Sequence, residues 1–251
     1  LLLAFSMAAM AQQKSADNIE ETALLKPQKS VTQGSVSVEG KSINYQAVAG
    51  TLILKTKEDK PTCSMFYTAY FKTGESDVSK RPVTFIYGGG PGFASFVLHF
   101  VAWGPQSVYL EDTAHIQPPF KAVNNDFCLL DASDLVFIDA PGTGFSRIIS
   151  KEKGGAGEPK NFYGADPDAQ AFASFITQFL SVYNLWNSPK YLMGESYGTF
   201  RSAILSNILE TQSGVALNEV SQLSETVNYN YWIGEHDPGT CMSFAMALAS
   251  Y

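Results

Sequence analysis

Residues 190–210 read KYLMGESYGTFRSAILSNILE, and this stretch predicts a strand that turns sharply into a helix. The run at 191–193 is apolar, and a helical pattern follows from Tyr197 to Glu210. Between them stands Gly194-Glu195-Ser196-Tyr197-Gly198, which matches the G-x-S-x-G nucleophile elbow. Such an elbow holds its serine in a strained turn, and its glycines let backbones pass where a Cβ would clash. The flanking strand and helix make this match more specific than an isolated glycine–serine string.

A second glycine-rich loop follows an earlier apolar run. VTFIY at 83–87 leads into Gly88-Gly89-Gly90-Pro91-Gly92. Acyl-transfer hydrolases with a nucleophile elbow take one oxyanion N–H from the residue after the nucleophile and another from a loop of this kind. Phosphate binding is the alternative, but the string fits neither G-x-x-x-x-G-K-[ST] nor G-x-G-x-x-G. A tight turn without a function is the remaining interpretation.

The chain divides into two patterns of hydrophobicity. Residues 35–72 alternate between apolar and polar side chains, which predicts antiparallel strands with turns at Glu39-Gly40 and Lys57–Pro61. From residue 83 onward, short continuous apolar runs end in glycine-rich loops, as LVFI at 135–138 does before DAPGTG. Continuous runs are typical of parallel strands that are buried on both faces.

One helix is predicted between the last two of these strands. Asp166 suits the N-cap and Pro167 the first helical position, while Asp168 favours the positive end of the helix dipole. Phenylalanines at helical spacing then predict packing against the sheet. Residues 217–227 form a weaker strand candidate. This alternation of strands and helices indicates an α/β fold.

Composition excludes several classes of protein. The 251 residues are 45% apolar and 16% charged, with a net charge of −7, which is typical of a globular protein. The chain has no basic run of the kind that a nucleic-acid-binding protein presents. The three cysteines, Cys63, Cys128 and Cys241, are too few for a disulfide scaffold, and their pairing is open. The sequence shows no metal-binding or cofactor motif, so we expect neither.

The first residues have the composition of a targeting segment. Residues 1–11, LLLAFSMAAMA, are uncharged and too short to span a bilayer. They match the apolar region of a secretory signal peptide, with an A-x-A cleavage site at Ala9–Ala11 before Gln12. An apolar helix of the mature fold is the alternative, but the polar extension at 12–33 argues against it. We therefore expect an exported protein, periplasmic or extracellular, without a membrane span.

Three motifs together resemble a known family. YGGGPGFASF, DLVFIDAPGTGFS and SPKYLMGESYGTFRSAILSN, in this order, are similar to the serine carboxypeptidases of the α/β-hydrolase superfamily, especially the exported bacterial members. The likeness covers residues 81–218. It implies a mostly parallel sheet flanked by helices, with antiparallel N-terminal strands. It also implies that Ser196 is acylated while C-terminal residues are cleaved from peptides, and that the Gly90 and Tyr197 N–H groups form the oxyanion hole.

The resemblance also implies residues that bind the substrate. Gly88, Gly89 and Glu195 match positions that help to hold the substrate's C-terminal carboxylate. A glutamic acid donates a hydrogen bond to a carboxylate only when it is protonated, which favours activity at acid pH. Two positions depart from the family: Gly88 replaces an asparagine, and Phe93 replaces a cysteine. An aminopeptidase or an esterase on the same fold is therefore an alternative, and a non-catalytic binding protein is another.

The partners of the serine are not evident in the sequence. A triad on this fold follows the order Ser, then Asp or Glu, then His. His236 is the only histidine after Ser196, and Asp237 follows it in the wrong order. Glu225 precedes His236, but only one weak strand candidate separates Ser196 from that histidine. His99 and His115 precede the nucleophile, and His99 is expected to be packed or to line a pocket.

In relatives, a helical insertion that caps the active site begins near the equivalent of Asn228. The sheet then resumes and carries the aspartate and the histidine. By this resemblance, residues 34–227 form a partial α/β-hydrolase core that is incomplete at its C-terminus, and 228–251 begin a truncated cap. The aspartate and the histidine are expected beyond residue 251, so the 251-residue chain is expected to be inactive. The sequence does not indicate an oligomeric state.

Overall fold

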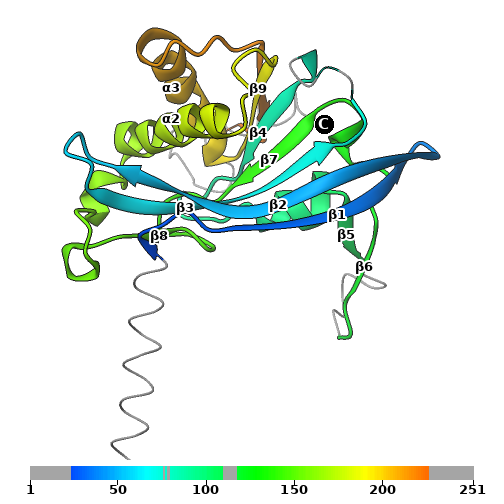
Figure 1. Cartoon of the computed structure of the whole chain (residues 1–251), viewed down its shortest axis with the longest axis horizontal. Coiled ribbons are helices and arrows are strands. Elements are labelled where there is room, and N and C mark those ends of the chain that lie inside the picture. The colour runs from blue at the N-terminus through cyan, green and yellow to red at the C-terminus, as the bar shows by residue number, and fades with distance from the viewer. Residues whose placement is uncertain (1–23, 76, 78–79, 110–117, 226–251) are drawn as a thin grey trace, which may run out of the picture.

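The computed structural model describes residues 24–75, 77, 80–109 and 118–225, and a twisted sheet organises them (Figure 1). This sheet has eight strands in the order β1-β2-β3-β7-β4-β9-β10, with β8 paired to β3, and β5 and β6 form a separate pair. The strands are β1 Lys29–Val38, β2 Lys41–Lys55, β3 Pro61–Lys72, β4 Val83–Tyr87, β5 Gln106–Tyr109, β6 Lys121–Asn124, β7 Asp134–Ile138, β8 Arg147–Ile148, β9 Lys190–Glu195 and β10 Glu219–Leu223. The helices are α2 Ala165–Val182 and α3 Tyr197–Gln212, with a π-helical turn at Leu98–Trp103 and 3-10 turns at Leu129–Asp131, Lys151–Lys153 and Pro159–Asn161.

The alternating half of the sequence forms an antiparallel meander, as predicted. β1 pairs with β2, β2 with β3, and β3 with β7, all antiparallel. The turn between β1 and β2 lies at Glu39-Gly40, where both residues have positive φ. β1 begins at Lys29, so the strand starts inside the range 12–33 that its polarity assigned to an N-terminal extension. Backbone pairing with β2 therefore extends further toward the N-terminus than hydrophobic alternation indicates.

The second half of the sheet is parallel, also as predicted. β7, β4, β9 and β10 are consecutive parallel neighbours. All five residues of β4 and of β7 are buried, which explains why all of them except Thr84 and Asp134 are apolar. The weak strand candidate at 217–227 contains β10. Since the carboxyl ends of parallel strands meet at one edge, the glycine-rich loops after β4, β7 and β9 gather there.

The two long helices lie together on one side of the sheet, and β5 and β6 lie on the other (Figure 1). The prediction that Asp166 caps the first helix is wrong. The N-cap of α2 is Gly164, whose φ of 137° is accessible to few other residues, so Asp166 falls within the first turn. α3 begins directly after Ser196, as predicted.

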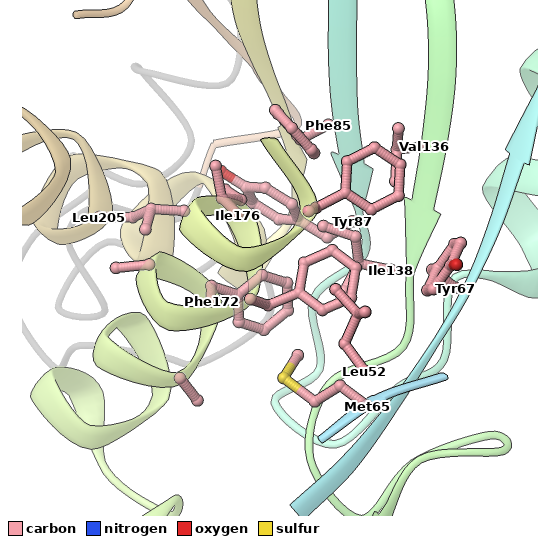
Figure 2. Packing of buried hydrophobic residues seen from close by; sticks show 14 of the residues in the cluster. Leu52, Met65, Tyr67, Phe85, Tyr87, Val136, Ile138, Phe172, Ile176 and Leu205 are labelled. Carbon is pink, nitrogen blue, oxygen red and sulfur yellow. The ribbon is translucent and has the colours of Figure 1, made fainter. Parts of the chain in front are cut away.

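The main core fills the space between the sheet and these helices. Figure 2 shows side chains of the sheet meeting those of α2 and α3 in this layer. A second apolar cluster lies elsewhere around Ile86, Leu98 and Phe137. Cys63 belongs to the first cluster and Cys128 to the second, and both are unpaired thiols. The labelled residues of the first cluster are Leu52, Met65, Tyr67, Phe85, Tyr87, Val136, Ile138, Phe172, Ile176 and Leu205.

Two of the expectations from the sequence concern segments that the structure does not describe. The signal-peptide segment 1–11 and the cap segment 228–251 lie outside the described residues. Within the described residues, no helix is both long and apolar enough to cross a membrane.

Candidate active site

Ser196 occupies the junction between β9 and α3 in a strained backbone conformation. Its φ is 57° and its ψ is −125°, a combination that is rare for a residue with a side chain. The Ser196 N–H donates to the carbonyl of Leu223 at 2.9 Å, and the Ser196 carbonyl accepts the N–H of Thr199 at 2.9 Å. The surrounding structure thus imposes the strain, as the nucleophile elbow predicts.

The two glycines of the motif are required by close contacts between backbones. A Cβ on Gly194 would lie 2.3 Å from the carbonyl oxygen of Gly198. A Cβ on Gly198 would lie 2.9 Å from the carbonyl oxygen of Tyr87, at the end of β4. These contacts are too short for any side chain, so the spacing of the motif reflects the packing of α3 against β9 and β4.

The glycine-rich loop after β4 lies directly against the elbow. A Cβ on Gly89 would lie 2.4 Å from the backbone nitrogen of Tyr197 and 2.8 Å from Cβ of Ser196. Gly90 is exposed with a φ of 109°, and no hydrogen bond among the described residues uses its N–H. Tyr197 is the first residue of α3, where backbone N–H groups and the helix dipole favour negative charge. The loop and the helix start therefore meet beside the serine, as the oxyanion prediction requires.

The residues predicted to contact a substrate carboxylate also lie together. Glu195 is the last residue of β9 and is partly exposed. Its Oε2 atom is 3.8 Å from the position that a Cβ on Gly88 would occupy. Other neighbours of that position are at 3.9 Å, so position 88 has space for a side chain, in contrast to position 89.

A carboxylate with no role predicted from the sequence joins two of the loops. Asp139, directly after β7, accepts the N–H of Ser95 at 2.9 Å and the N–H of Phe145 at 3.1 Å. Burial raises the pKa of Asp139, and the two N–H donors oppose this shift. The segment after the glycine-rich loop is thereby attached to the loop after β7.

Of the three histidines, His99 alone lies within the described residues, and it does not hydrogen bond to Ser196. Its Nε2 atom is 2.5 Å from the hydroxyl of Tyr70 on β3, and its ring stacks on Phe137. With these residues and Asp139, His99 lines a cavity of about 360 Å³. The prediction that His99 is a packed, pocket-lining residue is confirmed.

The burial of His99 predicts a pH dependence of stability. Desolvation lowers the pKa of His99 from 6.5 to about 4, so the unfolded chain binds a proton between these values while the folded chain does not. Stability is therefore retained above pH 6.5 and lost as the pH falls toward 4, by about 3 kcal/mol for this residue. Urea unfolding between pH 7 and pH 4 is expected to show this loss in the wild type but not in His99→Phe. Parallel pH profiles for the two proteins would contradict the assignment.

A buried ion pair beneath the site was not predicted. The sequence indicates only a helix-dipole role for Asp168 and no role for Arg201. In the structure, Nε of Arg201 lies 2.7 Å from Oδ2 of Asp168, and the two residues join α3 to α2. One signal was available in the sequence, because Arg201 shares a helical face with the buried residues Leu205 and Ile208.

Comparisons with known proteins agree with this geometry. The serine carboxypeptidase family model matches residues 39–237. A probable serine carboxypeptidase, CPVL, from Dictyostelium discoideum is 26% identical over an alignment of 186 residues. The match covers 67% of this chain and 34% of that protein. The crystal structure of Kex1(Δ)p, a prohormone-processing carboxypeptidase from Saccharomyces cerevisiae, matches with a TM-score of 0.54 and 23% identity. That match covers 71% of this chain and 38% of the yeast chain.

The chain therefore spans roughly a third of the length of these two relatives. Within that span, the strand order, the elbow at Ser196 and the position of the glycine-rich loop follow the α/β-hydrolase arrangement. The family match covers well over half of the sequence and includes all three motifs. By these observations, the chain belongs to the serine carboxypeptidase family and has the α/β-hydrolase fold.

Proposed function

We propose that the protein is a serine-type carboxypeptidase that removes C-terminal residues from peptides through an acyl-enzyme on Ser196. The observation that carries this proposal is the strained serine at the start of α3, with the Gly88–Gly92 loop packed against it. A strained nucleophile beside backbone N–H groups is suited to acyl transfer.

The proposed reaction has two stages. A base takes the Oγ proton of Ser196 while Oγ bonds to the scissile carbonyl carbon, and the N–H groups of Gly90 and Tyr197 stabilise the resulting oxyanion. The C–N bond then breaks, and the departing amino group receives the proton. In the second stage, the base takes a proton from water while the water oxygen bonds to the acyl carbon. The bond between that carbon and Oγ then breaks, Oγ of Ser196 regains the proton, and the shortened peptide leaves. We propose that the base and its acid come from residues outside the described ranges.

Glu195 and the Gly88–Gly89 segment are the proposed contacts for the substrate's terminal carboxylate. Their proximity supports recognition of a free C-terminus, because the carboxyl of Glu195 lies beside Gly88. The test is hydrolysis of matched peptides with free and amidated C-termini by the natural full-length protein. Preference for the free form supports a carboxypeptidase. Equal cleavage of both forms, or faster cleavage of a simple ester, would favour the aminopeptidase or esterase alternative that the glycine at 88 suggests.

The space beside Glu195 predicts a gain of function for Gly88→Asn. An asparagine amide at this position can donate to a carboxylate, and the backbone neighbourhood accepts a Cβ without a clash. We expect KM for free C-terminal peptides to fall roughly tenfold, since one hydrogen bond to a charged group contributes about 1.5 kcal/mol. Steady-state kinetics on the two peptide forms measure this effect, with Gly88→Ala as the control. An equal fall in KM for amidated peptides would contradict the proposed role.

We also propose that the protein is exported to the periplasm or the extracellular space. The support is the uncharged segment 1–11 with its A-x-A site. N-terminal sequencing of the protein purified from its native host is expected to begin at Gln12. A mature protein that retains residues 1–11 would contradict the proposal.

A further inference from the structure

The guanidinium of Arg201 lies under the active site and joins three separate elements. The side chain is 1% exposed and projects from α3, one and a half turns after Ser196. On one side, Nε and Nη2 donate to the two carboxylate oxygens of Asp168 on α2, at 2.7 and 3.3 Å. On the other side, Nη1 donates to the carbonyl oxygen of Gly88 at 2.8 Å. The carbon Cζ lies 4.3, 5.3 and 5.5 Å from the ring centroids of Phe172, Tyr197 and Tyr87.

The hydrogen bond to Gly88 constrains the loop that faces Ser196. The Gly88–Gly89 peptide is trans, so its N–H points opposite to its C=O. With the C=O directed at the buried guanidinium, the N–H of Gly89 must point away from Arg201. Three consecutive glycines have little conformational preference of their own, so contacts with the rest of the fold select their orientation. Arg201 supplies such a contact from the same helix whose first N–H belongs to the proposed oxyanion hole.

We propose that Arg201 is a positioning residue, which fixes the Gly88–Gly89 peptide and thereby holds the start of the loop whose next N–H, that of Gly90, is the proposed oxyanion donor beside Ser196. This inference rests on the proposed function of Ser196. Asp168 has a supporting role. Its carboxylate neutralises the guanidinium charge and accepts hydrogen bonds from Nε and Nη2, so that Nη1 donates to the carbonyl of Gly88. Substitution of Arg201 should therefore slow chemistry at Ser196 even where the fold is retained.

A second buried pair provides a matched control for stability. Nε of Arg81 lies 2.6 Å from Oδ1 of Asp134, and both side chains are 7% exposed. Arg81 also donates to a carbonyl, that of Leu130 at 2.5 Å. This pair flanks the amino ends of β4 and β7, at the opposite edge of the sheet from the glycine-rich loops. It is likewise a buried arginine–carboxylate pair with a backbone carbonyl partner, and it does not contact the loop, although Asp134 also accepts the N–H of Lys72 at 2.9 Å.

The test compares two double variants of the natural full-length protein, Asp168→Leu/Arg201→Met and Asp134→Leu/Arg81→Met. Replacement of a whole buried ion pair by apolar residues of similar size often preserves stability, whereas loss of one partner does not. Thermal melting confirms the fold of each variant. The rate constant for labelling by a fluorophosphonate then measures the chemistry at Ser196, since the tetrahedral adduct occupies the oxyanion hole.

We expect Asp168→Leu/Arg201→Met to be labelled roughly 10- to 100-fold more slowly than the wild type, because a small misplacement of catalytic groups has effects of this size. The Asp134→Leu/Arg81→Met control should be labelled within about twofold of the wild-type rate, which is the outcome expected for a purely structural pair. Equal rates for the wild type and the Arg201 variant would overturn the inference while leaving the proposed function intact. A wild type that is not labelled at Ser196 would instead overturn the proposed function. If the Arg201 double variant does not fold, Arg201→Lys is judged by the same criteria.

Discussion

Ser196→Ala is expected to lower kcat for peptide hydrolysis by about 10⁴-fold or more, because the nucleophile that forms the acyl-enzyme is removed. The fold should be unaffected. Within the described residues, the Ser196 hydroxyl makes no hydrogen bond, and the backbone bonds to Leu223 and Thr199 do not involve the side chain's oxygen. We therefore expect the free energy of unfolding to change by less than about 0.5 kcal/mol.

Two measurements on the same preparation check this prediction. Steady-state kinetics with a free C-terminal peptide give the loss of kcat, and urea unfolding gives the change in stability. Retention of more than a tenth of the wild-type kcat would contradict a nucleophilic role for Ser196. Loss of activity together with loss of folding would instead make the residue structural.

Gly89→Ala is expected to disrupt both activity and stability, whereas Gly88→Ala should disrupt neither to a comparable extent. The added methyl group at 89 would lie 2.4 Å from the nitrogen of Tyr197 and 2.8 Å from the carbonyl oxygen of Glu195. Both atoms belong to the backbone, so the loop and the elbow must separate. We expect a loss of about 1–3 kcal/mol in stability, typical of overpacking, and a loss of roughly 10²-fold in kcat from misplacement of the oxyanion donors.

The neighbouring glycine provides the control for this experiment. A Cβ at position 88 has no neighbour closer than 3.8 Å, so the same substitution one residue earlier introduces no clash. Both variants are assayed for kcat and for unfolding in urea. Equal kinetics for the two variants would show that contact between the loop and the elbow is not what positions the oxyanion donors.

The sequence predicts the local parts of this structure well. The strand–serine–helix unit around Ser196 needs only neighbouring residues, and β4 and β7 are recognisable because burial on both faces favours runs of apolar side chains. The antiparallel meander follows from the alternation of side chains along β2 and β3. Each of these features is encoded within one short segment of the chain.

Features that depend on distant segments were not predictable in the same way. Arg201 and Asp168 are 33 residues apart, and their pairing depends on how α2 packs against α3. Asp166 has a suitable side chain for an N-cap, but the conformation of Gly164 decides where α2 begins. The space at position 88 and the contact at position 89 cannot be distinguished from the string of glycines, because they arise from the approach of β4 to α3.

Covalent labelling shows whether Ser196 is the reactive nucleophile of the protein. The natural full-length protein is treated with a fluorophosphonate, and the adduct is located by mass spectrometry of the digested protein. We expect one adduct per chain, on the peptide that contains Gly194–Gly198, and none in Ser196→Ala. An unlabelled wild type, or labelling that persists in Ser196→Ala, would contradict it.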